Sequence, residues 1–164
     1  MHLTKCYELR RAQVLPIDLA QAWRFFSDPR NLALITPPWM HFEIVSEAGE
    51  GIYAGQIITY RVNILPLVRV TWVTEIAHVR PQQFFVDQQQ VGPYSLWHHQ
   101  HLLRPHSNGT EVVDIVNYVM PYGVLGRFAH ALFVGRMLVH IFDYRRRVLA
   151  ERFGGSLGGG YVCQ

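Results

Sequence analysis

The sequence predicts an α+β fold in which a curved antiparallel sheet of about six or seven strands wraps round one long C-terminal helix. Three observations support this prediction. Residues 42–120 carry short runs rich in Ile, Val, Tyr and Phe, separated by glycine and proline turns. Residues 124–153 contain no proline and repeat apolar side chains at helical spacing. Two helix-start signals follow the first predicted strand, which indicates two short helices before the sheet continues.

The N-terminal segment is predicted to form one strand and two short helices. Residues 7–15 mix Tyr, Leu and Val with charged side chains, as is typical of a strand, and a proline follows them. Asp18 is a predicted helix N-cap, with Gln21 as its capping-box partner three residues later. Asp28 and Pro29 repeat the start signal, a cap followed by proline at the first helical position, for the second short helix.

Strands fill most of the middle of the chain. Asn108 and Gly109 form a hairpin signal, so the segments on either side of them are predicted to pair. Apolar and polar side chains alternate in residues 69–79, as expected for a strand with one buried face. We predict strands over residues 42–46, 56–64, 69–79, 84–90, 94–103 and 111–120.

The last predicted element is a single helix that begins at Val124 and ends near Phe153. One apolar stripe is expected to face the sheet, and it consists of Phe133, Met137, Ile141, Tyr144 and Val148. A second stripe at the start of the helix needs cover from the short helices or from another subunit, and it consists of Leu125, Phe128 and Leu132. A homodimer through this half of the helix is therefore one expectation.

The charge pattern does not indicate nucleic acid as a partner. The chain carries 15 Lys and Arg against 12 Asp and Glu, and the formal charge of +3 is too mild to predict nucleic-acid binding. Arg145, Arg146 and Arg147 form a run near the end of the long helix. We expect this run to lie on a solvated face, where cations favour the helix dipole. An acidic partner or a membrane surface is the alternative interpretation.

Composition and length indicate one globular, cytoplasmic domain. With 164 residues, 49% apolar and 16% charged, the chain matches a single folded domain rather than a disordered segment. We expect the domain to span residues 1–153 and the glycine-rich residues 154–164 to form a flexible tail. The two cysteines, near opposite ends, suit a reducing compartment. No apolar run is long enough to predict a signal peptide or a transmembrane helix.

Three histidines within four residues are the most informative local feature of the chain. Successive strand residues point to opposite faces, so Trp97, His99 and His101 share one face, opposite His98 and Gln100. Neighbouring strands add two carboxylates and further aromatic side chains. If the faces coincide, one surface of the sheet holds Trp72, Asp87, Gln89, Trp97, His99, His101, Asp114 and Tyr118.

Four interpretations of this polar row remain open. It can be a buried network that orients a ligand or only the sheet, since buried charges need partners. It can be a structural row on the solvated face of the sheet. It can hold a metal, because His-x-His on a strand is a metal-ligand geometry, although no third or fourth ligand is evident. It can carry acid–base catalysis by a His–Asp pair, but the chain offers no nucleophile motif.

Several segments together resemble one protein superfamily. They are Phe25-Phe26-Ser27-Asp28-Pro29-Arg30-Asn31-Leu32, Thr36-Pro37-Pro38, Trp72-Val73-Thr74-Glu75-Ile76, Phe85-Val86-Asp87-Gln88-Gln89, Gly92-Pro93-Tyr94-Ser95-Leu96-Trp97-His98-His99-Gln100-His101, Asp114-Ile115-Val116-Asn117-Tyr118-Val119-Met120-Pro121 and Ile141-Phe142-Asp143-Tyr144-Arg145. With the element order, they make residues 5–153 similar to the helix-grip fold of the SRPBCC superfamily, which includes START and birch-pollen-allergen proteins. Within it the chain resembles small bacterial ligand-binding or polyketide cyclase/dehydrase-like proteins.

The resemblance implies a hydrophobic cavity between sheet and C-terminal helix that binds a lipid, a quinone or a polyketide-like molecule. The alternative function is a polyketide cyclase or dehydratase that uses a His–Asp pair. The resemblance implies no shared catalytic residue, and we expect no cofactor and no metal. The residues expected to line the cavity are Trp72, Phe85, Asp87, Gln89, Trp97, His99, His101, Asp114, Tyr118, Met137 and Ile141.

Overall fold

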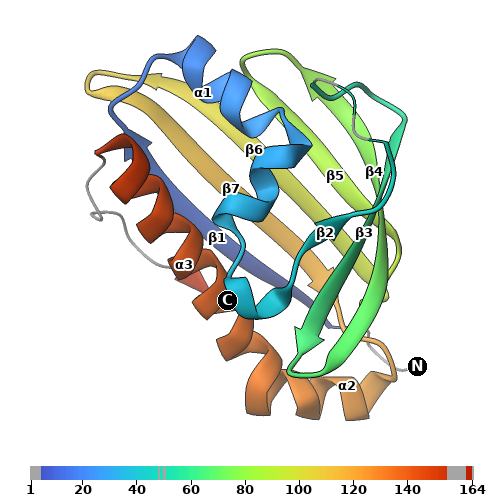
Figure 1. Cartoon of the computed structure of the whole chain (residues 1–164). Helices are drawn as coiled ribbons and strands as arrows, with labels where there is room; N and C mark the ends of the chain where they lie inside the picture. The colour runs from blue at the N-terminus through green and yellow to red at the C-terminus, as the bar shows by residue number, and fades with distance from the viewer. Residues whose placement is uncertain (1–4, 48, 50, 155–161, 164) are drawn as a thin grey trace.

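The computed structural model describes residues 5–47, 49, 51–154 and 162–163, which fold round one strongly bent sheet (Figure 1). Neighbouring strands are antiparallel throughout, in the order β2-β3-β4-β5-β6-β7-β1-β8. The N-terminal strand therefore lies beside the last long strand of the chain. The strands are β1 (Cys6–Leu15), β2 (Glu43–Ile44), β3 (Gln56–Leu65), β4 (Val68–Arg80), β5 (Phe84–Val91), β6 (Leu96–His106), β7 (Gly109–Val119) and β8 (Val162–Cys163).

Short helices cover one face of the sheet directly after β1 (Figure 1). They are α1 (Leu19–Phe26) and the 3₁₀ turns η1 (Pro29–Ile35) and η2 (Pro38–Met40). The Asp18 carboxylate accepts a hydrogen bond of 2.7 Å from the backbone N–H of Gln21, and that of Asp28 accepts one of 3.0 Å from the N–H of Arg30. These caps satisfy amides that have no partner within a helix. The predicted α+β fold, with two short helices after the first strand, is confirmed.

Breaks in strand register accompany the curvature of the sheet. The pairing of β3 with β4 shifts between Asn63 and Leu65, and the pairing of β4 with β5 shifts between Ile76 and His78. Such irregularities bend a strand and increase its twist. The inward-facing side chains of the central strands therefore converge on one interior instead of lying on a flat surface.

Two apolar clusters fill the ends of this interior. The cluster beside α1 includes Leu15, Ala22, Phe25, Phe26, Leu103 and Leu149. The cluster at the other end joins β1, β6 and β7 to the C-terminal helix and includes Tyr7, Trp97, Val116, Tyr118, Leu138 and Phe142. Polar side chains and a cavity occupy the space between these clusters, as described below.

The C-terminal helix bends near its start, where a π-helical turn interrupts the α-helical pattern. It comprises α2 (Gly123–Ala129), the π turn η3 (His130–Val134) and α3 (Gly135–Phe153), and Figure 1 shows α2 turned away from the axis of α3. A π turn holds an extra residue and is a common cause of a helix kink. The predicted long C-terminal helix is confirmed, and the π turn within it is a feature that the sequence analysis did not predict.

His130 is the first residue of the π turn and contacts the sheet. Its Nε2 lies 2.7 Å from the hydroxyl oxygen of Tyr118, and its ring stacks on Tyr7 with centroids 3.6 Å apart. Gly135 follows one turn later, and a Cβ there would lie only 3.1 Å from the imidazole Cε1 of His130. The extra residue of the turn thus places an imidazole against the sheet, where it bonds to a buried tyrosine.

The buried face of α3 differs from the stripe predicted from the sequence. Phe133 is 42% exposed, and Met137 and Ile141 are half-buried. The extra residue of the π turn rotates the following face of the helix by roughly 100°. The α3 side chains that are fully buried are Leu138, Phe142, Arg145, Arg146 and Leu149. The expectation that the arginine run is solvated was therefore wrong for its first two members.

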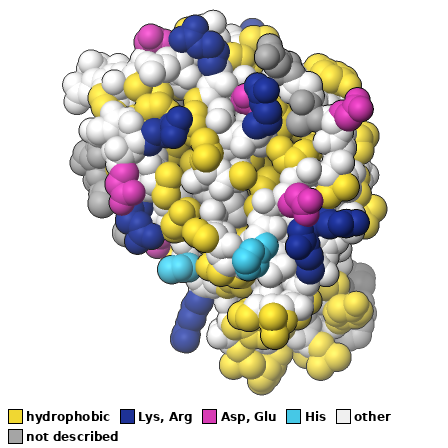
Figure 2. Space-filling model, viewed as in Figure 1, with side chains coloured by type: hydrophobic (Ala, Val, Ile, Leu, Met, Phe, Trp, Pro, Cys, Tyr) yellow, Lys and Arg dark blue, Asp and Glu magenta, His cyan; other side chains and the backbone are white. Residues whose placement is uncertain are grey.

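The start of the C-terminal helix is exposed. Leu125, Phe128 and Leu132 have 77%, 67% and 62% of their surface accessible. Figure 2 shows hydrophobic side chains gathered over this end of the molecule, at the position of α2 in Figure 1. Within the described part of the chain the predicted second stripe lacks cover, and the homodimer that this stripe suggested stays a prediction.

The helix from Gly123 to Phe153 has the length and composition of a membrane span. It is 31 residues long, and its most apolar 18-residue window has a mean hydropathy of 1.3, with 17% of that window buried. Its C-terminal half nevertheless packs on the sheet through Leu138 and Phe142. This half of the helix therefore belongs to the core of a globular domain. The expectation that no segment spans a membrane stays a prediction.

The predicted flexible tail, residues 154–164, falls mostly on residues 155–161 and 164, which lie outside the described part of the chain. Val162 and Cys163 are described and form β8, which pairs with Arg10 and Leu9 of β1. The boundary of a single domain at residue 153 stays a prediction.

Candidate ligand cavity and its charged cluster

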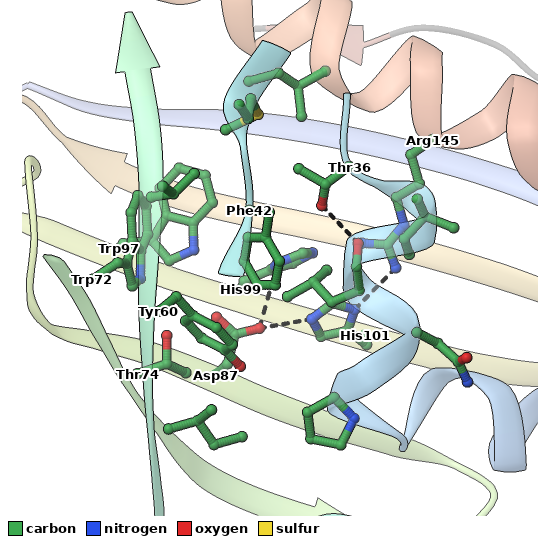
Figure 3. Close-up of a pocket in the computed structure, with 18 of the residues that line it drawn as sticks. Thr36, Phe42, Tyr60, Trp72, Thr74, Asp87, Trp97, His99, His101 and Arg145 are labelled. Carbon is green, nitrogen blue, oxygen red and sulfur yellow. Dashed lines mark hydrogen bonds and ion pairs between the residues drawn. The ribbon is translucent and has the colours of Figure 1, made fainter. Parts of the chain in front are cut away.

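A cavity of about 200 Å³ lies between the sheet and the helices. Strands β3 to β6 form one wall, and η1, η2 and α3 contribute the other. Figure 3 shows Trp72 and Trp97 at one end of the cavity, and His101 with Arg145 at the other. The lining is mainly apolar, with charged side chains concentrated at the second end.

Aromatic contacts shape the apolar end of the cavity. The rings of Trp72 and Trp97 meet edge to face with centroids 5.3 Å apart, and Tyr94 lies 4.9 Å from Trp97. On the neighbouring wall the rings of Phe42 and Tyr60 are 4.8 Å apart. Such edge-to-face and tilted pairs are favourable arrangements of aromatic side chains. They give this end of the cavity flat, rigid walls.

Most of the side chains predicted to line a cavity do so. They are Trp72, Phe85, Asp87, Trp97, His99, His101, Met137 and Ile141. Gln89 is not among the residues that line the cavity. Its side-chain amide instead donates a hydrogen bond of 2.7 Å to the backbone carbonyl of Tyr94. Tyr118 bonds to His130 at the other end of the sheet. Asp114 is buried behind the two histidines and holds them from that side.

The histidine row of β6 points into the molecule. Trp97, His99 and His101 are buried, whereas His98 and Gln100 are half-buried on the opposite face. The strand period of two explains why the residues separate in this way. The interpretation of the row as a solvated surface feature was wrong, because the helices cover this face of the sheet.

Each of the two buried histidines contacts two carboxylates. Strand register places Asp87 of β5 opposite His99, and Asp114 of β7 opposite His101. The closest contacts run diagonally: His101 Nε2 lies 2.7 Å from Asp87 Oδ2, and His99 Nε2 lies 3.0 Å from Asp114 Oδ1. Diagonal neighbours on one sheet face are within reach of long side chains. The two imidazoles and the two carboxylates therefore form one cluster.

Asp114 is the centre of this cluster on the side away from the cavity. Its Oδ1 lies 3.0 Å from His99 Nε2, 3.1 Å from His101 Nδ1 and 3.3 Å from a terminal nitrogen of Arg145. A carboxylate oxygen only accepts hydrogen bonds, so each of the three nitrogens is assigned as the donor. Arg145 supplies the positive charge that a buried carboxylate needs.

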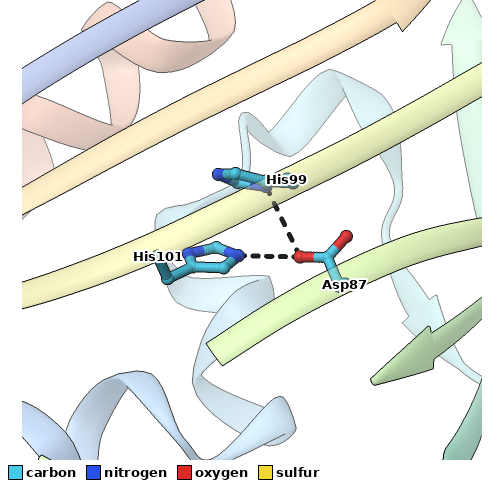
Figure 4. Close-up of side chains that lie close together, drawn as sticks. All are labelled: Asp87, His99 and His101. Atoms are coloured by element: carbon cyan, nitrogen blue, oxygen red, sulfur yellow. Dashed lines mark hydrogen bonds and ion pairs between the residues drawn. The ribbon is translucent and has the colours of Figure 1, made fainter. Parts of the chain in front are cut away.

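Asp87 contacts the opposite side of the same imidazoles. Figure 4 shows its carboxylate facing both rings. Its Oδ2 lies 2.7 Å from His101 Nε2 and 3.5 Å from His99 Nδ1. Unlike Asp114, Asp87 lines the cavity. Each ring is thus held between a carboxylate at the cavity wall and a carboxylate behind it.

The cluster holds its carboxylates ionised. Burial alone would raise the pKa of Asp114, but the charge of Arg145 and hydrogen bonds from the two histidines hold that pKa well below its usual range. Burial would likewise raise the pKa of Asp87, and the charges of His99 and His101 together with the His101 hydrogen bond outweigh it, so the pKa is lowered. A charged carboxylate therefore stands at the cavity wall.

The pKa values of the two buried histidines are shifted in opposite directions. Burial would lower the pKa of His101, but its hydrogen bonds to Asp114 and Asp87 raise that pKa above the ordinary value. Burial and the neighbouring charge of His101 lower the pKa of His99. A proton is thus held more readily by His101 than by His99.

Arg145 is the functional residue that the sequence analysis missed. It is 6% exposed, lines the cavity and pairs with Asp114. The sequence could have predicted its burial, because Arg145 falls at helical spacing with the buried Leu138, Phe142 and Leu149. Tyr60 of β3 and Thr36 after η1 also line the cavity, and neither stands out in the sequence.

One group of side chains has the composition of a metal-binding site. Asp87, His99 and His101 each offer one ligand atom, and these atoms lie within 4.8 Å of one another. The sequence analysis found no third ligand for the His-x-His pair. Strand pairing supplies Asp87 as that third group, since it lies directly opposite His99.

A bent antiparallel sheet round a C-terminal helix, with an apolar cavity between them, defines the helix-grip class. Solved structures with this fold confirm that assignment. A protein of Chromobacterium violaceum aligns with a TM-score of 0.67 and 13% identity, covering 89% of this chain and 96% of that one. The major latex-like protein of Panax ginseng aligns with a TM-score of 0.66 and 11% identity, covering 90% and 97%.

A Thalictrum norcoclaurine synthase, solved as a point mutant with a transition-state analogue, aligns with a TM-score of 0.62 and 14% identity, covering 91% and 97%. The family described as polyketide cyclase/dehydrase and lipid transport matches residues 15–141. The chain belongs to this family, and the predicted SRPBCC relationship is confirmed. No curated protein is similar enough to match the sequence.

Proposed function

We propose that the protein binds a small hydrophobic molecule in the cavity between the sheet and α3. One observation carries this proposal: a mainly apolar cavity of about 200 Å³ ends at a buried cluster of charged side chains. Ligand sites in proteins combine apolar walls with a few placed polar groups in this way. The cytoplasmic location predicted from the cysteine content belongs to the same proposal.

The cavity volume sets the size of the ligand. A cavity of about 150 Å³ accommodates one benzene ring, whereas drug-sized ligands occupy pockets of roughly 300 Å³ or more. A volume of about 200 Å³ therefore suits a molecule with one or two rings, or part of an acyl chain. The flat walls at Trp72, Trp97 and Tyr60 favour a planar ring over a bulky polycycle.

Polar side chains on the sheet wall of the cavity can orient such a ligand. Burial raises the pKa of Tyr60, so its hydroxyl stays neutral and can donate a hydrogen bond to a carbonyl oxygen. Thr74 is buried on the adjacent strand and lines the same wall. A quinone or an aromatic polyketide has carbonyl or hydroxyl oxygens at the edge of a planar ring, which matches these donors.

A thermal-shift and fluorescence titration tests the proposal. Three probe molecules are used. Menadione represents quinones, 1-naphthol represents aromatic polyketides, and dodecanoate represents fatty acids. We expect at least one of them to raise the Tm, because a ligand that binds the folded state stabilises it. Menadione binding should also quench the fluorescence of Trp72 and Trp97, which line the cavity.

A matched pair of variants locates the binding. Ile58 is 1% exposed and lines the cavity, whereas the adjacent Ile57 is 52% exposed on the other face of β3. Ile58→Phe should fill the cavity and abolish the ligand-induced shift, while Ile57→Phe should retain it. Absence of a shift for all three molecules in the wild type would contradict the proposal, as would equal shifts in both variants.

The second candidate is an enzyme of the cyclase or dehydratase type. The observation that favours it is the contact of 2.7 Å between His101 and Asp87 at the cavity wall. Because the pKa of His101 is raised, its imidazolium can protonate a hydroxyl group as the C–O bond breaks. The carboxylate of Asp87, which also lines the cavity, can take the proton from the neighbouring carbon as the C=C bond forms. Conversion of a 3-hydroxyacyl thioester to the enoyl thioester would reveal this activity by absorbance.

His101→Gln and Asp87→Asn should each lower that rate by about 10²-fold or more. His98→Gln is the control, because His98 lies on the same strand but on the opposite face. Equal rates in wild type and His101→Gln would contradict the enzymatic function. The binding proposal would be unaffected, because the thermal-shift titration tests it separately.

A further inference from the structure

We propose that Asp87 Oδ2, His99 Nδ1 and His101 Nε2 form a binding site for one divalent transition metal ion. Two imidazoles and one carboxylate are a common ligand set for zinc and for iron(II). Each of the three residues offers one ligand atom, and these atoms lie within 4.8 Å of one another. The inference goes beyond binding of an apolar molecule and does not depend on it.

Hydrogen bonding to Asp114 leaves the right nitrogens free for a metal. Asp114 Oδ1 lies 3.0 Å from His99 Nε2 and 3.1 Å from His101 Nδ1. If both of these nitrogens carry the proton, the other nitrogen of each neutral ring has a lone pair. These lone pairs are the ones directed toward Asp87 Oδ2, at 3.5 Å and 2.7 Å.

This arrangement is the one that supports metal-binding histidines in proteins. A ligating imidazole nearly always donates its second N–H to a carboxylate or carbonyl, which fixes its orientation and makes it a stronger ligand. Here a single carboxylate oxygen of Asp114 supports both rings. Arg145, at 3.3 Å, anchors that oxygen from α3.

Charge balance in the cluster also favours a cation at this position. Arg145 compensates Asp114, so the negative charge of Asp87 is left for a proton on His101 or for a metal ion. The metal ion would take the place of that proton on His101 Nε2.

The distances allow coordination after a small adjustment. Ligand atoms about 2.0–2.1 Å from a tetrahedral ion are roughly 3.3 Å apart. The separation of 3.5 Å between Asp87 and His99 already matches, and the separation of 2.7 Å between Asp87 and His101 must widen. Because all three residues line the cavity, a fourth ligand position would face the cavity, where a water or a ligand oxygen can bind.

Zinc titration of the untagged full chain tests the site in the absence of any organic ligand. After treatment with a chelator, isothermal titration with Zn²⁺ should show one ion bound per chain. His99→Gln and Asp87→Asn should weaken the affinity by about 100-fold or more, because each removes one of three ligands. Asp114→Asn should weaken it about 10-fold to 100-fold through the loss of support for both rings.

Two controls exclude other zinc ligands. His98→Gln alters a histidine on the opposite face of β6, and Cys6→Ser removes an exposed thiol. Both variants should bind Zn²⁺ as the wild type does. If wild type binds no stoichiometric ion, or if His98→Gln loses as much affinity as His99→Gln, the cluster is a hydrogen-bond network only and the inference is overturned.

A measurement on the wild type keeps the test valid if the cluster variants fail to fold. In the ¹H–¹⁵N spectrum of the imidazole rings, Zn²⁺ should shift the signals of His99 Nδ1 and His101 Nε2 and leave those of His98 unchanged. Unchanged signals for His99 and His101 in the presence of saturating zinc would refute the site.

Discussion

The two halves of the C-terminal helix share one backbone but have different surroundings. In α3, Leu138 and Phe142 are buried against the sheet, and Arg145 pairs with Asp114. In α2, Leu125 and Phe128 are 77% and 67% exposed. Figure 1 shows the sheet extending beneath α3, whereas α2 lies at the end of the sheet.

This difference shows that the position of a helical segment relative to the sheet decides its burial. The apolar half of the helix is exposed, and the half that carries three consecutive arginines holds the buried face. Large exposed apolar patches often mark sites of interaction. We therefore expect α3 to determine stability and the cluster, and α2 to determine association.

The largest effect should come from breaking the ion pair that joins α3 to the cluster. Arg145→Met removes the guanidinium from Asp114 and leaves that carboxylate buried without its cation. We expect the free energy of unfolding to fall by about 3–5 kcal/mol, measured by urea denaturation. Arg147→Met, on the exposed side of the same helix, is the control and should change stability by less than about 0.5 kcal/mol. Similar losses in both variants would contradict a buried role for Arg145.

A matched pair of leucines measures the packing difference directly. Leu138 in α3 is 3% exposed, and Leu132 before it is 62% exposed. Leu138→Ala should lower the free energy of unfolding by about 3 kcal/mol, because it leaves a cavity in the core. Leu132→Ala should change it by less than about 0.5 kcal/mol. An equal effect at the two positions would show that the exposed start of the C-terminal helix is covered in solution.

The junction between the halves should respond to pH. Burial and the nearby charge of Lys5 lower the pKa of His130, so the folded state holds this ring neutral. The unfolded chain takes up the proton first, near pH 6.5, and His130 therefore contributes stability above that pH that is lost as the pH falls.

Between pH 7 and pH 5 this loss should be well under about 1 kcal/mol, because the ring is partly exposed and solvent screens its charge. His130→Gln should remove this part of the pH dependence in denaturation curves. The same pH dependence in wild type and His130→Gln would disprove the assignment to this ring.

The smallest effect on stability, and the one most specific to α2, should come from Phe128→Asp. Since the side chain is 67% exposed, the free energy of unfolding should change by less than about 0.5 kcal/mol. If this face forms the predicted homodimer, the variant should elute later from a sizing column and have the mass of one chain by light scattering. Tyr53→Asp, at a residue 66% exposed elsewhere, is the control. An unchanged mass would argue against a dimer through α2.

Local rules in the sequence predicted much of the fold. Asp18 and Asp28 begin helices because a short carboxylate side chain can cap a free backbone amide. The alternation of a strand separates Trp97, His99 and His101 from His98, whatever the strand packs against. The cavity-lining roles of Met137 and Ile141 followed from the family resemblance, although neither is on the fully buried face of α3.

Tertiary structure decided the composition of the charged cluster. Asp87 and Asp114 reach the same imidazoles because β5 and β7 flank β6 in a particular register, which residue spacing cannot specify. Arg145 joins them because α3 packs on the sheet with this side chain buried beside Asp114. An arginine in a run of three is ordinarily solvated, and only the buried carboxylate opposite it makes burial favourable.

The sequence by itself determined the class of fold. It also determined that Trp97, His99 and His101 lie on the same face of one strand. Both follow from interactions between residues close together in the chain, which obey fixed periods of 2 and 3.6. Only the tertiary structure decided that this face is the inner one. That choice depends on which side of the sheet the helices cover and on how far the sheet bends, and these result from contacts between residues distant in the chain.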